Sequence, residues 1–121
     1  LNTRTEEDGG TLHVSSENLN LVVSSSVFNS GSASRGGAVY IGNGNIDTLF
    51  TNVTFVSNIG SIAGGAFFVQ DSNDGVVISE CTFIDNSAQY YGGAIIIVSA
   101  NTRISIENSV FRCNKAASGG D

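Results

Sequence analysis

The chain has 121 residues, 40% of them hydrophobic, and a formal net charge of −6 with only five lysines and arginines. So few basic residues argue against nucleic-acid binding and against docking on anionic membranes, because both depend on several cationic side chains. The sequence also lacks an apolar run of the roughly 20 residues that span a bilayer, so we expect no direct membrane insertion.

A repeat of 27 or 28 residues runs through the sequence. Glycine pairs stand at Gly9-Gly10, Gly36-Gly37, Gly64-Gly65, Gly92-Gly93 and Gly119-Gly120. A phenylalanine keeps the same spacing at Phe28, Phe55, Phe83 and Phe111, and an asparagine follows the later three at Asn58, Asn86 and Asn114. Three markers in one register predict a single domain over 1–121, with repeats at approximately 9–35, 36–63, 64–91 and 92–118.

Each repeat contains three short apolar runs separated by turn-forming residues. In chain order the predicted strands cover 12–14, 19–23 and a run ending at 28; then 39–41, 46–50 and a run ending at 55; then 67–69, 76–78 and a run ending at 83; then 95–98, 104–106 and a run ending at 111. These runs are too short for amphipathic helices. We therefore predict an all-β fold, a right-handed single-stranded parallel β-helix (β-solenoid) of about four coils with three strands each.

Stacked coils align equivalent residues into columns. Two columns are wholly apolar and are predicted to face the interior: Leu12, Val39, Phe67 and Ile95, and Val14, Ile41, Val69 and Ile97. The phenylalanine markers are predicted to stack inside, and the asparagine markers to form a hydrogen-bonded ladder. The glycine pairs are predicted at sharp corners, which need positive φ or close backbone approach. All these markers are interpreted as structural.

A fourth column lies between the two apolar ones and contains His13, Tyr40, Phe68 and Ile96. Strand alternation points these side chains outward. An exposed aromatic stripe is a candidate contact surface for a protein or a glycan. The alternative is that a loop or a neighbouring chain covers it.

Two motifs resemble those of the polymorphic outer-membrane proteins. Residues 36–39, 64–67 and 92–95 resemble the family's Gly-Gly-Ala motif, and residues 55–58, 83–86 and 111–114 resemble its Phe-x-x-Asn motif. The first unit departs from the pattern, with Thr11 after its glycines and Gly31 in place of the asparagine. The resemblance implies an extracellular or cell-surface β-helix that is often linked to adhesion.

Catalysis is not expected. Hydrolysis by paired carboxylates needs two acids facing a groove at about 5–10 Å, whereas Glu80 and Glu107, which are predicted neighbours, stand beside polar turns. His13 is the single histidine, and no Gly-x-Ser-x-Gly nucleophile motif accompanies it. The acidic turn at 71–75 lacks the spacing of a calcium loop. We therefore expect no catalytic residue, no metal and no cofactor.

The two cysteines and one sequon give further predictions. On stacked strands Cys81 and Cys113 differ by four positions, about 13 Å, which exceeds the roughly 7 Å reach of a disulfide. Cys81 is predicted to be buried and Cys113 to lie in a turn. Asn52-Val53-Thr54 is the single N-glycosylation triplet, so Asn52 is the candidate position if the protein is a secreted eukaryotic one.

The sequence contains no methionine, so we expect a processed product or a segment of a longer protein. The first and last glycine pairs place the two ends nearly in phase, which would let copies stack head to tail. The sequence thus indicates a non-enzymatic extracellular structural or adhesive module that associates with itself. Two alternatives stay open: a segment of a surface adhesin that binds host cells or glycans, and a fragment of a polysaccharide-degrading β-helix enzyme.

Overall fold

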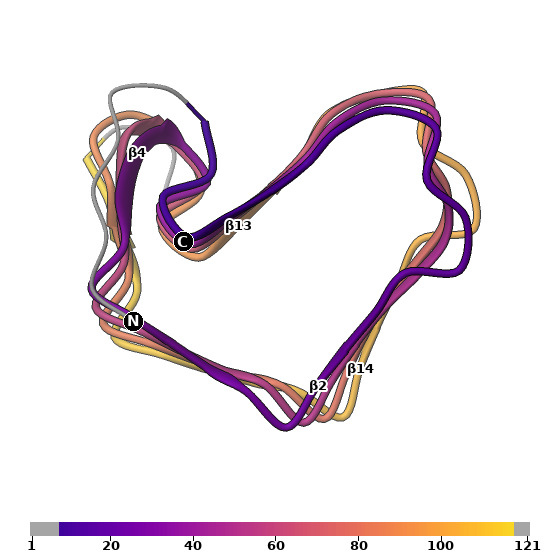
Figure 1. Ribbon diagram of the computed structural model, residues 1–121. Helices are drawn as coiled ribbons and strands as arrows, with labels where there is room; N and C mark the ends of the chain where they lie inside the picture. Colours follow the sequence, from indigo (N-terminus) through magenta and orange to yellow (C-terminus); the bar gives the residue numbers. More distant parts are fainter. Residues whose placement is uncertain (1–7, 118–121) are drawn as a thin grey trace.

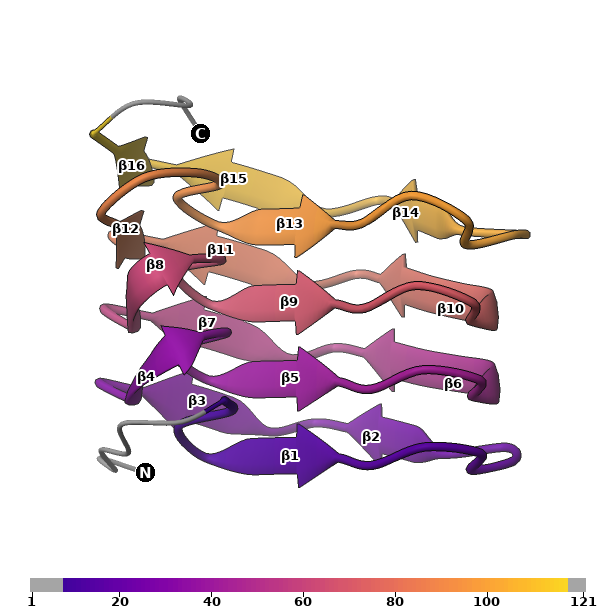
Figure 2. The same cartoon turned by 90° about the horizontal axis from the view of Figure 1, so that it is seen from above.

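The computed structural model describes residues 8–117 and shows a solenoid of stacked, parallel coils (Figures 1 and 2). The first sheet contains β1 (Leu12–Val14), β5 (Val39–Ile41), β9 (Phe67–Val69) and β13 (Ile95–Ile97). The second contains β2 (Val22–Ser24), β6 (Ile46–Thr51), β10 (Asp74–Ser79) and β14 (Ser105–Glu107). The third contains β3 (Val27–Asn29), β7 (Thr54–Val56), β11 (Thr82–Ile84) and β15 (Val110–Arg112). The predicted all-β parallel solenoid of about four coils is confirmed.

Each described coil has a fourth strand, so the prediction of three strands per coil is wrong. The fourth sheet contains β4 (Ser32–Arg35), β8 (Ile59–Ala63), β12 (Ser87–Ala88) and β16 (Lys115–Ala116). These segments are short and rich in serine and alanine, so they carry no apolar run, and pairing with the neighbouring coils makes them strands. Between β4 and β5 the chain turns back toward the middle of the coil, so the outline in Figure 1 is indented, not triangular.

The predicted interior columns are confirmed by the strand register. Val39 pairs with Phe67, which pairs with Ile95, and the two members in the middle coils are fully buried. The phenylalanine markers form a continuous stack, with ring centroids 5.2, 4.6 and 4.8 Å apart from Phe28 to Phe111. The stack is inside the coils for Phe28, Phe55 and Phe83, whereas Phe111 on the last described coil is partly exposed.

The two glycines of each pair serve different purposes. The first has positive φ, 66° at Gly36, 65° at Gly64 and 62° at Gly92, which side chains with a Cβ adopt at a cost. The second allows close approach, because a Cβ built on Gly65 would lie 2.0 Å from the carbonyl oxygen of Gly93 in the next coil. The expectation of corners with positive φ or close approach is therefore confirmed, with one role for each glycine. The last pair, Gly119-Gly120, lies outside the described residues.

The predicted asparagine ladder is present and buried. The side-chain oxygen of Asn86 accepts hydrogen bonds from the backbone N–H and the side-chain amide of Asn58, both at 2.9 Å. Asn114 accepts the same pair of bonds from Asn86. Each side-chain amide also donates to a phenylalanine carbonyl of the preceding coil, Phe28 for Asn58 and Phe55 for Asn86. The ladder thus satisfies buried backbone groups at the corner after each Phe marker.

A second asparagine ladder was not predicted. It joins Asn18, Asn45, Asn73 and Asn101, at the turn between the first and second sheets. Asn45 and Asn73 are fully buried. Their spacing of 27 or 28 residues was a signal that could have identified this ladder in the sequence.

The cysteines lie as predicted. Cys81 is buried and its thiol donates to the carbonyl oxygens of Phe50 and Ser79 at 3.4 and 3.3 Å. Cys113 is exposed at a corner with φ of 57°. Both are free thiols in the structure.

Candidate contact surfaces

The predicted contact column points out of the coil but is largely covered. Tyr40 and Phe68 stack at 5.5 Å between centroids and pack with Ala63 in a cluster separate from the interior core. Only 7% of Tyr40 and 5% of Phe68 is exposed. Ile96 is half-buried, and His13 alone is exposed. The prediction that this column is exposed is therefore wrong for Tyr40 and Phe68. The alternative prediction, that another segment covers the column, is correct for these two residues.

The covering segment is the fourth strand, which folds back beside the first sheet (Figure 1). Arg35 on β4 places its guanidinium 5.1 Å from the ring centroids of both Tyr40 and Phe68. Asp8 receives two hydrogen bonds from the same guanidinium, at 2.9 and 2.7 Å. The Asp8 carboxylate raises the pKa of Arg35 further, so the cation over the rings is permanent.

Asn52 lies at an exposed corner between β6 and β7. Its φ is 53°, and its side-chain amide donates to the hydroxyl of Ser25 in the preceding coil at 3.4 Å. Thr54, the third residue of the sequon, is half-buried at the start of β7. The side chain is thus accessible, and glycosylation at Asn52 stays a prediction.

The carboxylates do not form a groove in the described part of the chain. Glu80 and Glu107 are neighbours, because the N–H of Glu80 donates to the carbonyl of Glu107 at 3.1 Å, and both side chains are exposed. Residues 8–117 contain no pocket and no group of three or more His, Cys, Asp or Glu residues that would suit a metal ion.

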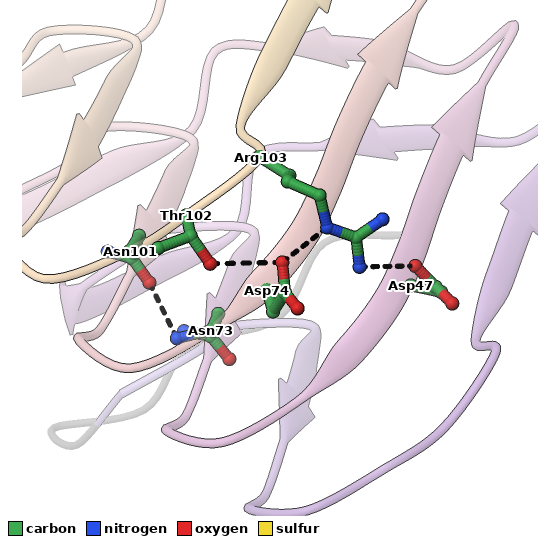
Figure 3. Close-up of polar contacts among 6 residues, drawn as sticks. All are labelled: Asp47, Asn73, Asp74, Asn101, Thr102 and Arg103. Atoms are coloured by element: carbon green, nitrogen blue, oxygen red, sulfur yellow. Dashed lines mark hydrogen bonds and ion pairs between the residues drawn. The ribbon is translucent and has the colours of Figure 1, made fainter.

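The acidic turn at 71–75 joins an exposed polar cluster (Figure 3). Arg103 donates to Asp74 at 2.6 Å and to Asp47 at 3.2 Å, and the hydroxyl of Thr102 donates to Asp74 at 2.9 Å. Hydrogen bonds from Arg103 and Thr102 lower the pKa of Asp74. Asp47, Asp74 and Arg103 belong to three successive coils, and the guanidinium of Arg103 lies between the two carboxylates and pairs with both.

The structure adds detail to one surface that the sequence indicated, the end of the solenoid, and reveals a second that it did not. One is the face of the last described coil, where Phe111 is 46% exposed although its column partners Phe55 and Phe83 are fully buried. Ile106 and Ile97 are exposed there too, and their partners Ile78 and Val69 are fully buried.

The other surface lies on the fourth sheet of the two middle coils. Ile62, Tyr90 and Tyr91 are 47%, 45% and 56% exposed. The backbone N–H groups of Tyr90 and Tyr91 donate to the carbonyl of Ile62 at 3.1 and 3.4 Å, so the three residues are adjacent. We call this surface, formed by Ile62, Tyr90 and Tyr91, the tyrosine ridge.

Comparison with known proteins identifies the repeat. Residues 80–97 match the family model of the Chlamydia polymorphic membrane protein repeat. This segment contains one Phe-x-x-Asn motif and the Gly-Gly-Ala motif that follows it, which are the ladder corner and the glycine corner of one coil. No curated protein and no solved structure matches the chain. Within residues 8–117 there is no helix of the length and apolar character needed to cross a membrane. The matched segment and the stacked coils together support a parallel β-helix whose repeats are similar to those of the polymorphic membrane proteins.

Proposed function

We propose that the chain is a non-enzymatic structural module of a surface protein, and that it extends by stacking a further coil on its C-terminal face. The repeat type supports the surface location, because the polymorphic membrane proteins are surface proteins of the outer membrane. A structural role is supported by the regular pairing of the coils, in which the four strands of each described coil pair with those of the next.

The observation that carries the proposal is the incomplete core at the last described coil. Phe111, Ile106 and Ile97 belong to columns that are fully buried in the coils beneath them. These apolar groups are exposed on the last described coil, and covering them with a further coil would be favourable. The strands of this coil, β13 to β16, also present an edge that parallel pairing could continue.

The N-terminal coil of a second copy supplies matching positions. Its β1 and β3 carry the same two apolar columns and the phenylalanine marker, at Leu12, Val14 and Phe28. Asn18 offers the side-chain oxygen that the backbone of Asn101 would need to continue the second ladder, by analogy with the bond from Asn73 to Asn101. Gly31 has no such oxygen, so the first ladder would be interrupted at this junction.

The test compares two substitutions on one strand. Phe111→Asp places a charge in the end face, whereas Val110→Asp places it on the side of the solenoid, where Val110 is already exposed. We expect the unmodified protein to sediment as concentration-dependent oligomers and to form short rods in negative-stain images. Phe111→Asp should abolish the association and Val110→Asp should leave it unchanged. A folded protein that stays monomeric at high concentration would contradict the proposal.

A further inference from the structure

The tyrosine ridge lies where each of the two middle coils has one extra residue. The step from Gly31 to Gly36 is five residues, whereas the equivalent steps from Asn58 to Gly64 and from Asn86 to Gly92 are six. The strand register shifts at the same place, between Ala33 and Arg35 on β4 as it pairs with β8. The additional residue therefore lies in β8 and in the segment after β12, where it acts as a bulge.

The bulge changes which side chains face solvent. In β8 the exposed and buried residues alternate until Ser61 and Ile62, which are both exposed. In the next coil Gln89, Tyr90 and Tyr91 are all exposed. The pattern therefore holds for Tyr90, whereas Tyr91 is exposed at the position where β8 has the buried Ala63. The ring centroids of the two tyrosines lie 6.4 Å apart, with their planes inclined by 41°. The bulge accounts for the exposure of Tyr90, and Tyr91 beside it is exposed in register with Ala63, so two adjacent aromatic rings lie on the side of the solenoid.

The two segments that carry the ridge are polar but uncharged, and charged residues stand only at their borders, Lys115 on one side and Arg35 on the other. The segments 59–63 and 87–91 contain no acidic or basic residue, in a protein with a net charge of −6. The exposed neighbours that can form hydrogen bonds are the hydroxyl of Ser61 and the amide of Gln89. Lys115, which pairs with Ser87 in the last coil, borders the surface.

We propose that the tyrosine ridge binds a neutral glycan. The apolar face of a sugar ring packs against an aromatic ring, and amide and hydroxyl groups at the rim bond its hydroxyls. A stable protein interface commonly needs about 20–30 residues on each side, far more than the three ridge residues and their two polar neighbours offer. Ile62 is on β8 and the two tyrosines follow β12, in the two coils before the last described coil, whereas the end-face residues Phe111, Ile106 and Ile97 are on β15, β14 and β13. Figure 2 shows β8 and β12 below β16 in the stack. The stacking proposal and this one can therefore fail independently.

The test is a titration of the isotope-labelled chain followed by NMR. The probes are cellotetraose, chitotetraose and mannotetraose, with a sulfated heparin tetrasaccharide as the charged comparison. We expect at least one neutral probe to shift the amide signals of Ile62, Tyr90 and Tyr91 with a Kd of about 1 mM or tighter. Heparin should leave these signals in place because the protein is acidic.

Substitutions assign the effect to the rings. Tyr90→Ser combined with Tyr91→Ser should weaken binding at least about tenfold, whereas Tyr90→Phe with Tyr91→Phe should retain most of it, since the rings remain. Val22→Ser, at another exposed apolar position, is the matched control and should have no effect. No shift with any neutral probe, or shifts located away from the ridge, would overturn the proposal. So would a self-association that the double serine variant abolishes, because the ridge would then be a protein interface.

Discussion

Phe55 and Phe83 stack face to face in successive coils, with ring centroids 4.6 Å apart and planes inclined by 8°. Both rings are fully buried, and Phe67 packs edge-on against Phe55 with centroids 5.7 Å apart. This arrangement places the largest apolar side chains of the repeat at the strand spacing of about 4.8 Å. The stability of the coil is therefore expected to depend strongly on this column.

Replacing Phe83 by alanine should lower the free energy of unfolding by about 3–5 kcal/mol, because the change leaves a cavity between two other rings. Phe111→Ala is the comparison, and it should cost less than about 2 kcal/mol because that ring is already partly exposed. Urea unfolding followed by circular dichroism measures both values. Equal losses for the two variants would show that the stack is not the main source of stability.

Gly65→Ala should destabilise the protein by about 2–3 kcal/mol. The added Cβ would lie 2.0 Å from the carbonyl oxygen of Gly93, and the backbone on both sides is held by coil pairing, with the N–H of Gly65 donating to the carbonyl of Gly92 at 3.0 Å. Gly42→Ala is the matched control, since its nearest atom would be 3.1 Å away. Thermal melting of both variants tests this, and a Gly65→Ala melting temperature at or above that of Gly42→Ala would refute it.

Asn86→Ala should cost about 2–4 kcal/mol, because it leaves a buried N–H of Asn58 and the carbonyl of Phe55 without their partners. Asn43→Ala serves as the control. That asparagine is exposed, and its one side-chain bond to Asp71 is 3.4 Å long, so the change should stay within about 0.5 kcal/mol. Hydrogen exchange should also speed up at the amide of Asn58 in the first variant only.

Thr48→Val should stabilise the fold by about 1 kcal/mol. The hydroxyl of Thr48 is fully buried and is unpaired within the described residues, at a position where the next coil has Val76. Valine has the same shape and removes the unpaired polar atom. Thr54→Val, on the half-buried outer face of β7, should change stability by less than about 0.5 kcal/mol. A loss of stability in Thr48→Val, measured by urea unfolding, would indicate that the hydroxyl has a partner such as a buried water.

Iodoacetamide should modify Cys113 rapidly and Cys81 only on unfolding. Burial raises the pKa of the Cys81 thiol, so little of the reactive thiolate forms, and the side chain is also inaccessible. Cys113 is exposed at its corner. Mass spectrometry after a short reaction at pH 8 should find one label per folded chain and two in urea. Rapid double labelling of folded protein would place Cys81 at the surface.

The repeat length, the interior columns and the first asparagine ladder followed from the sequence by itself. In a solenoid each coil contacts only its neighbours, so a residue such as Phe55 meets the residues one repeat away and no others in its column. Spacing in the sequence therefore translates directly into contact in space. The same argument applies to Asn45 and Asn73, whose spacing of 28 residues also predicts that they are neighbours.

Only the tertiary structure decided what covers the outer faces. Strand alternation correctly predicted that the side chains of Tyr40 and Phe68 face away from the interior. It carries no information on whether another segment packs over them. That depended on the angle at which the chain turns back after β4, which Arg35 and the positive-φ corner at Gly36 hold in place. One inserted residue in β8 likewise left Ile62 exposed, because a bulge sets two residues opposite one and interrupts the alternation there, before pairing resumes at Arg35 and Ala63.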